Sequence, residues 1–104
     1  MSFKKSENWK WKDWDISWSS TKQTSNNSDL NILLIHGFGA SKRHWRHNQD
    51  FLGNIHNCYS IDLLGFGESS QPGALLDYES YKNNHVKYSF DLWGSQVATF
   101  CNEV

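Results

Sequence analysis

An apolar run that stops at two closely spaced glycines constrains the fold of this 104-residue chain more than any other feature. Residues 30–35 read Leu-Asn-Ile-Leu-Leu-Ile, and Gly37 and Gly39 follow directly. A run that is apolar at nearly every position is typical of a strand covered on both faces, as in a parallel sheet. Because glycine favours tight turns, the strand is predicted to end at a sharp bend.

A helix and a second strand are predicted after this bend. Ser41 can cap a helix over residues 42–52, with Gly53 near its end. Residues 58–63, Cys-Tyr-Ser-Ile-Asp-Leu, have the pattern of the next strand. A crossover of this length favours parallel pairing, so residues 30–69 are predicted to form a βαβ unit and the fold class to be α/β.

The N-terminal segment, residues 1–29, is predicted to be a strand pair followed by a polar loop. Apolar and polar residues alternate over residues 9–18, which is the period of a half-buried hairpin, and Lys12 and Asp13 are its expected turn. Residues 19–29 contain no apolar residue and are therefore predicted to be a loop.

The C-terminal segment, residues 89–104, is predicted to be a helix that follows a loop at 70–88. Ser89 is the expected N-cap, with Asp91 in the first turn. Apolar residues recur there at spacings of three and four, on one helix face: Phe90, Trp93, Val97, Phe100, Cys101 and Val104. No stop signal follows Val104, so a further strand is expected beyond this helix.

Composition excludes several classes of function. The net charge of -1 gives no reason to expect binding to nucleic acid or to an anionic membrane, and the apolar runs are shorter than the ~18 residues of a membrane span. Cys58 and Cys101 lack metal-type spacing and are predicted to be buried free thiols, which favours a cytoplasmic protein. No cofactor is predicted.

A metal site is also not predicted. His44 and His47 lie three residues apart on the expected helix, close enough to share a metal, but no third ligand falls at a matching spacing. The favoured interpretation is a solvated basic helix face that includes Lys42, Arg43 and Arg46.

Two motifs carry a resemblance to a known family. His36-Gly37-Phe38-Gly39-Ala40-Ser41, with Trp45 four residues on, and Asp62-Leu63-Leu64-Gly65-Phe66-Gly67-Glu68-Ser69 resemble the two turns that follow successive strands in α/β-hydrolases. The resemblance extends through Trp9-Lys10-Trp11 and Trp93-Gly94-Ser95-Gln96-Val97. Within the family, the sequences of the second motif and of the helix at Trp93 are most similar to hydrolases of cyanobacteria and chloroplasts, including pheophytinase-like esterases. The chain is thus identified as the N-terminal portion of this fold.

The resemblance implies roles for single residues. Acyl-transfer enzymes use hydrogen-bond donors to stabilise the negative charge that develops on a carbonyl oxygen. The resemblance implies that one such donor is the backbone N–H of Phe38. The phenyl ring offers no hydrogen bond, unlike the Asn usual in haloalkane dehalogenases, so ester or related acyl hydrolysis is favoured. The other motif residues are assigned to loop structure: His36, Gly37, Gly39, Ser41, Trp45, Asp62, Gly65, Gly67 and Ser69.

Other interpretations of these motifs stay open. Gly37 and Gly39 would also suit a turn with no catalytic role. They precede a helix and are followed by Asp62, as in dinucleotide-binding proteins, although Lys42 occupies the third glycine position of that motif. The tryptophans and lysines of residues 4–18 could stack on single-stranded nucleic acid, but packing against the sheet is favoured because acidic residues interrupt the positive charge.

The sequence contains no nucleophile elbow, since neither Gly-x-Ser-x-Gly nor Gly-x-Asp-x-Gly occurs in it. We therefore expect a truncated hydrolase segment that is inactive alone and meets a small ester-like substrate only if completed. The alternative is an assembly subunit that completes its sheet with a second chain carrying the catalytic residues. The strand at residues 30–35 would then have a free edge, which predicts self-association.

Overall fold

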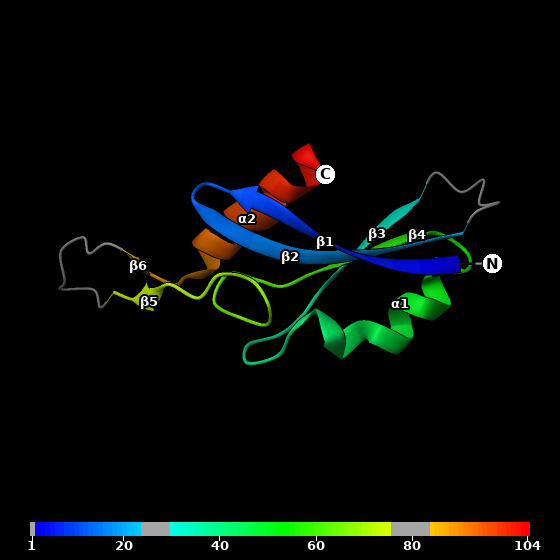
Figure 1. The fold of residues 1–104 in the computed structure, drawn as a ribbon, viewed down its shortest axis with the longest axis horizontal. Helices are drawn as coiled ribbons and strands as arrows, with labels where there is room; N and C mark the ends of the chain where they lie inside the picture. The colour runs from blue at the N-terminus through cyan, green and yellow to red at the C-terminus, as the bar shows by residue number, and fades with distance from the viewer. Residues whose placement is uncertain (1, 24–29, 76–83) are drawn as a thin grey trace.

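A computed structural model describes residues 2–23, 30–75 and 84–104. Four strands form one mixed sheet in the order β1-β2-β4-β3, and the two α-helices lie on opposite faces of it (Figure 1). The elements are β1 (Ser2–Trp11), β2 (Trp14–Gln23), β3 (Asn31–Ile35), the 3-10 helix η1 (Lys42–Trp45), α1 (Arg46–Gly53), β4 (Asn57–Ile61), β5 (Gly73–Ala74), β6 (His85–Val86) and α2 (Phe90–Glu103).

The N-terminal hairpin is present, and its turn is the predicted pair Lys12 and Asp13, with Lys12 at a φ of 55°. The predicted loop from residue 19 was wrong, because β2 continues to Gln23. Ser19 is buried, but its hydroxyl keeps hydrogen-bond partners. It donates to the Gln49 side chain of α1 at 3.1 Å and lies 2.9 Å from the Ser60 hydroxyl. Internal partners of this kind let a polar strand pack in a sheet. The rest of that predicted loop, residues 24–29, lies outside the described residues.

The βαβ unit has the predicted parallel pairing, with Ile32 of β3 opposite Cys58 of β4. Ser41 caps the crossover, since its hydroxyl accepts from the Arg43 N–H at 3.3 Å. The crossover begins as one turn of 3-10 helix before α1.

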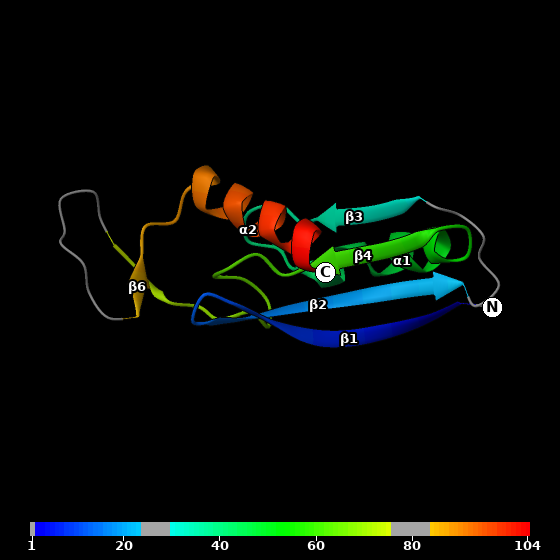
Figure 2. The same ribbon diagram turned by 90° about the horizontal axis from the view of Figure 1, so that it is seen from above.

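Strand β3 is not covered on both faces, contrary to prediction: its end residues are exposed and its middle three are half-buried. The reason is that α1 packs mainly against β1, β2 and β4, while β3 lies at the edge of the sheet with β4 as its single neighbour among the described strands (Figure 2). A strand with one neighbour presents a row of unpaired backbone groups to its surroundings.

Helix α2 is anchored at its C-terminal half. Phe100 is 3% exposed and packs edge-on against Trp9 and Trp18, with ring centroids 5.5 Å apart in both pairs. The predicted apolar stripe of α2 is buried only in part, because Phe90, Cys101 and Val104 are exposed. The expectation of a buried thiol is therefore met by Cys58 and wrong for Cys101.

The segment predicted as a loop at 70–88 contains two short strands. β5 and β6 pair in parallel, with Gly73 opposite His85, while residues 76–83 of that segment lie outside the described part of the chain. No helix within the described ranges is long and apolar enough to cross a bilayer.

Candidate active-site loop

The turn that follows β3 is closed by a hydrogen bond from the Ala40 N–H to the Gly37 carbonyl at 3.1 Å. Gly39 has a φ of +79°, whereas Phe38 is not among the residues with positive φ. A four-residue turn with positive φ at its third position is of type II, so Phe38 occupies the second position. Gly39 thus has the conformation for which glycine is required.

The backbone N–H of Phe38 has no hydrogen-bond acceptor among the described residues. Its side chain is 91% exposed, and its ring packs edge-on against the ring of Phe66, with the centroids 5.4 Å apart. A fixed N–H without an internal partner is available to a ligand.

His36 ties this turn to the turn that follows β4. The side chain is buried, and its Nε2 accepts a hydrogen bond from the Leu63 N–H at 3.0 Å. Its Nδ1 must then carry the proton and donates to the Gly37 carbonyl at 2.8 Å. Because both ring nitrogens are engaged, this histidine has no free nitrogen to act as a base.

Asp62 organises the second turn from inside the protein. Its buried carboxylate accepts from the Lys42 N–H at 2.6 Å and from the Glu68 N–H at 2.9 Å. Gly67 has a φ of +56°, and a Cβ there would overlap that carboxylate. Ser69 completes the turn, donating to the Asp62 carbonyl at 2.7 Å and accepting from the Ser17 N–H at 2.9 Å.

Lys42 belongs to this network, and its predicted place on a solvated helix face was wrong. The residue is 6% exposed, and its Nζ lies 2.9 Å from a carboxylate oxygen of Asp62 and 2.9 Å from one of Glu68. Burial by itself lowers the pKa of the ammonium group, but the hydrogen bonds to Glu68 and Asp62 outweigh it, so the pKa is raised. A cation in a first helical turn is unfavourable unless it is paired, and this was the available sequence signal.

The remaining basic residues of the crossover match the prediction, since Arg43, His44, Arg46 and His47 are exposed. The ring of His44 packs edge-on against Trp45 at 4.7 Å. No group of three potential metal-ligating side chains occurs in the described ranges.

Helix α2 reaches the second turn through a residue whose role the sequence did not reveal. Gln96 is fully buried; its Oε1 accepts from the Leu64 N–H at 2.9 Å and its Nε2 donates to the Asp62 carbonyl at 3.2 Å. Trp93 adds a hydrogen bond from its indole N–H to the Leu64 carbonyl at 3.0 Å. Gly65, at a φ of +93°, leaves room for the ring of Tyr88, which lies 2.7 Å from where a Cβ would be.

The two turns and α2 border an open groove of about 840 Å³ that carries no charged side chain. Its lining residues are Ile35, His36, Gly37, Phe38, Leu63, Phe66, Tyr88, Ser89, Phe90, Trp93, Gly94, Val97 and Ala98. The backbone N–H of Phe38 therefore belongs to a residue that borders an apolar groove.

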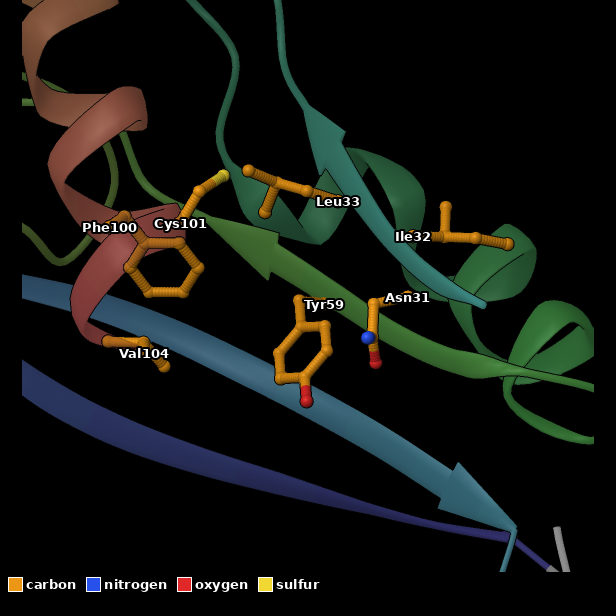
Figure 3. Close-up of a pocket in the computed structure, with 7 residues that line it drawn as sticks. All are labelled: Asn31, Ile32, Leu33, Tyr59, Phe100, Cys101 and Val104. Carbon is orange, nitrogen blue, oxygen red and sulfur yellow. The ribbon is translucent and has the colours of Figure 1, made fainter. Parts of the chain in front are cut away.

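A second, smaller hollow of about 200 Å³ lies between the C-terminal end of α2 and strands β3 and β4. Figure 3 shows the last turn of α2, with Phe100, Cys101 and Val104, beside Tyr59 and Leu33 of the sheet. This hollow is separate from the two turns and carries no charged side chain.

Comparison with known proteins places these features in context. A family model described as the alpha/beta hydrolase fold matches residues 31–101. Human (lyso)-N-acylphosphatidylethanolamine lipase is 33% identical over 76 residues, which is 73% of this chain and 22% of that protein. Rat 1-acylglycerol-3-phosphate O-acyltransferase ABHD5 is 34% identical over 76 residues, again 73% of this chain and 21% of that protein. The chain thus spans about a fifth of the length of these relatives.

Solved structures show the same fold. A membrane phospholipase A, described as a bacterial virulence factor, matches 95% of this chain and 27% of its own at 26% identity, with a TM-score of 0.72. A haloalkane dehalogenase variant from Bradyrhizobium elkanii matches 96% of this chain and 28% of its own at 17% identity, with a TM-score of 0.74. At that lower identity the likeness concerns the fold alone.

Proposed function

The chain belongs to the α/β-hydrolase fold family, and from this premise we propose that it supplies one half of the oxyanion hole of an ester hydrolase. The observation that carries the proposal is the backbone N–H of Phe38, which lies in a fixed turn, has no acceptor in the described part of the chain and borders an apolar groove. His36, Asp62 and Ser69 hold the two turns together and take no chemical part.

The chemistry follows from this placement. In acyl transfer a carbonyl oxygen gains negative charge in the transition state, and a donor that is already oriented stabilises that charge without reorganising. The hydrogen bond from the Ala40 N–H to the Gly37 carbonyl closes the turn that holds the Phe38 N–H. The groove beside this N–H is lined mainly by apolar side chains, and a bound apolar substrate that displaced water from it would strengthen such a hydrogen bond.

An acyl ester is the proposed substrate class. The names of two relatives describe a lipase and an acyltransferase, both at 33–34% identity. The phenyl ring at Phe38 provides no side-chain donor, which favours ester over haloalkane chemistry. The 104 residues contain no nucleophile elbow, so we propose that they do not hydrolyse esters by themselves.

The test uses the completed protein, meaning this chain continued after Val104 by the remaining portion of a related hydrolase. Phe38→Pro removes the N–H, and proline is favoured at the second position of a type II turn, so the backbone keeps its shape. We expect kcat for ester hydrolysis to fall by about 10²–10³. Phe38→Ala, which keeps the N–H, is the matched control; equal activities of the two folded variants would refute the donor role.

A second candidate function rests on the edge strand. β3 pairs on one side only within the described residues, and its middle is half-buried. An assembly subunit that completes its sheet with a separate catalytic chain would cover this edge. Co-expression with a separate remainder of a related hydrolase tests this alternative: hydrolysis restored by two chains supports it, and hydrolysis from the fused form alone argues against it.

A further inference from the structure

We propose that Lys42 is a positioning residue, whose buried ammonium group fixes the turn that carries the Phe38 N–H. This inference rests on the proposed function, because it assigns a role to the loop that holds the oxyanion donor. In this role Lys42 does not contact the substrate and acts through the shape of that loop. Lys42 is not among the site residues predicted from the sequence.

The contacts of Lys42 join two turns that are distant in sequence. Its Nζ bridges one carboxylate oxygen of Asp62 and one of Glu68, each at 2.9 Å, and its backbone N–H donates to the other Asp62 oxygen at 2.6 Å. The side chains of Lys42 and Asp62 are both buried, whereas that of Glu68 is largely exposed. The side chain and the backbone of one residue thus hold the same carboxylate.

This pairing determines where the oxyanion loop can lie. Lys42 follows Ser41 at the end of the loop, and His36 holds its beginning through the Leu63 N–H at 3.0 Å. Both anchors are on the Asp62–Ser69 turn, so the five residues between His36 and Lys42 are fixed at each end. The Phe38 ring adds a third contact to the same turn, at Phe66.

A neutral side chain at position 42 would leave the buried carboxylate of Asp62 without its ammonium partner. An unpaired buried charge is strongly unfavourable, so the turn would rearrange to admit water or another cation. Because the loop is anchored on that turn, the direction of the Phe38 N–H would change with it. A small misplacement of a catalytic group costs up to about 10²-fold in rate.

The experiment compares four variants of the completed protein. Lys42→Met removes the ammonium, Lys42→Arg keeps a cation at this position, and Lys42→Met with Asp62→Asn removes both buried charges, so that no buried carboxylate is left unpaired. Arg43→Met, which removes the exposed neighbouring cation, is the matched control. The readouts are kcat and KM for an ester, and hydrogen exchange at the Ala40 amide, whose bond closes the turn.

We expect Lys42→Met to lower kcat about 10- to 100-fold with KM unchanged and to speed exchange at Ala40, while amides of the β1–β2 hairpin keep their rates. Lys42→Arg should recover most of the activity, and Arg43→Met should match the parent. The double variant should regain stability because it has no unpaired buried charge, but it should not regain kcat, because it still lacks the ammonium bridge from Lys42 to Asp62 and Glu68 that positions the loop. Recovery of kcat together with stability, or unchanged kcat in Lys42→Met, would overturn the proposal.

The two proposals fail in different ways. If the parent completed protein were folded but showed no dependence on the Phe38 N–H, the donor role would be wrong, and exchange at Ala40 would still decide whether Lys42 holds the turn. If Lys42→Met did not fold, the double variant would decide between positioning and stability alone. Unchanged exchange at Ala40 in every variant would exclude Lys42 as a positioning residue.

Discussion

At the level of single residues, a buried ion pair between Lys42 and Asp62 holds the loop that carries the Phe38 N–H. Asp62 is fully buried and satisfied by the N–H groups of Lys42 and Glu68 and by the Lys42 ammonium. The motif spacing indicated that Asp62 belongs to a turn, but it did not identify Lys42 as its partner. The two residues are twenty positions apart, and only the parallel pairing of β3 with β4 brings the turns that follow them together.

Gly67 offers a test of how tightly the Asp62 turn is built. Gly67→Ala places a Cβ against the Asp62 carboxylate at a positive φ, so we expect the completed protein to lose about 1–3 kcal/mol of unfolding free energy. Gly94→Ala is the matched control, because no atom lies within 4 Å of its Cβ position in α2. There we expect a gain of about 0.5–1 kcal/mol. Urea unfolding measures both changes; equal losses in the two variants would show that the Asp62 turn has no special need for glycine at position 67.

The raised pKa of Lys42 predicts a pH dependence of stability. A group whose pKa is higher in the folded state stabilises the protein fully below its ordinary pKa, here 10.5, and this contribution is lost as the pH rises through the folded-state value. The parent should therefore lose more unfolding free energy between neutral pH and strongly alkaline pH than Lys42→Met does. Urea unfolding across that range measures the difference. Parallel curves for the two proteins would show that the ammonium contributes nothing to folding.

The elements differ in how far local sequence determined them. The hairpin turn at Lys12 and Asp13, the β3–β4 pairing and the Ser89 cap followed from residues near in sequence. The length of β2 did not, because Ser19 becomes suitable for a strand only when Gln49 and Ser60 are beside it. The exposure of β3 also depends on its neighbours, which a pattern within one strand does not reveal.

The edge strand predicts the behaviour of the chain in solution. Among the described strands β3 pairs with β4 alone, and of its five residues only Asn31 is polar, so we expect self-association of the isolated chain. Leu33→Lys should raise solubility, because a charge on an edge strand opposes pairing, and it should abolish complementation by a separate remainder. Asn48→Lys, the same change in charge on exposed α1, is the control. Size-exclusion chromatography measures the oligomeric state, and a monomeric parent would contradict the expectation.

Seen as one molecule, the chain is a sheet flanked by α1 and α2 with two turns at one end (Figure 1). The fold class could be predicted because two motifs follow two predicted strands in the order that the fold requires, and this order can be read directly from the sequence. The groove could not be predicted, because it is lined by residues from three separate segments, and the helix pattern that placed Phe90 on an apolar face did not reveal that it is 90% exposed.

Labelling with a serine-directed fluorophosphonate tests most directly the claim that this chain supplies an oxyanion donor but no nucleophile. Ser41 is a helix cap, Ser69 is a buried turn residue and Ser95 lies within α2, so none of them sits on an elbow beside a histidine base. We expect no labelling of the isolated chain, and labelling of the added portion alone in the completed protein. Stoichiometric labelling at any of these three serines would contradict it.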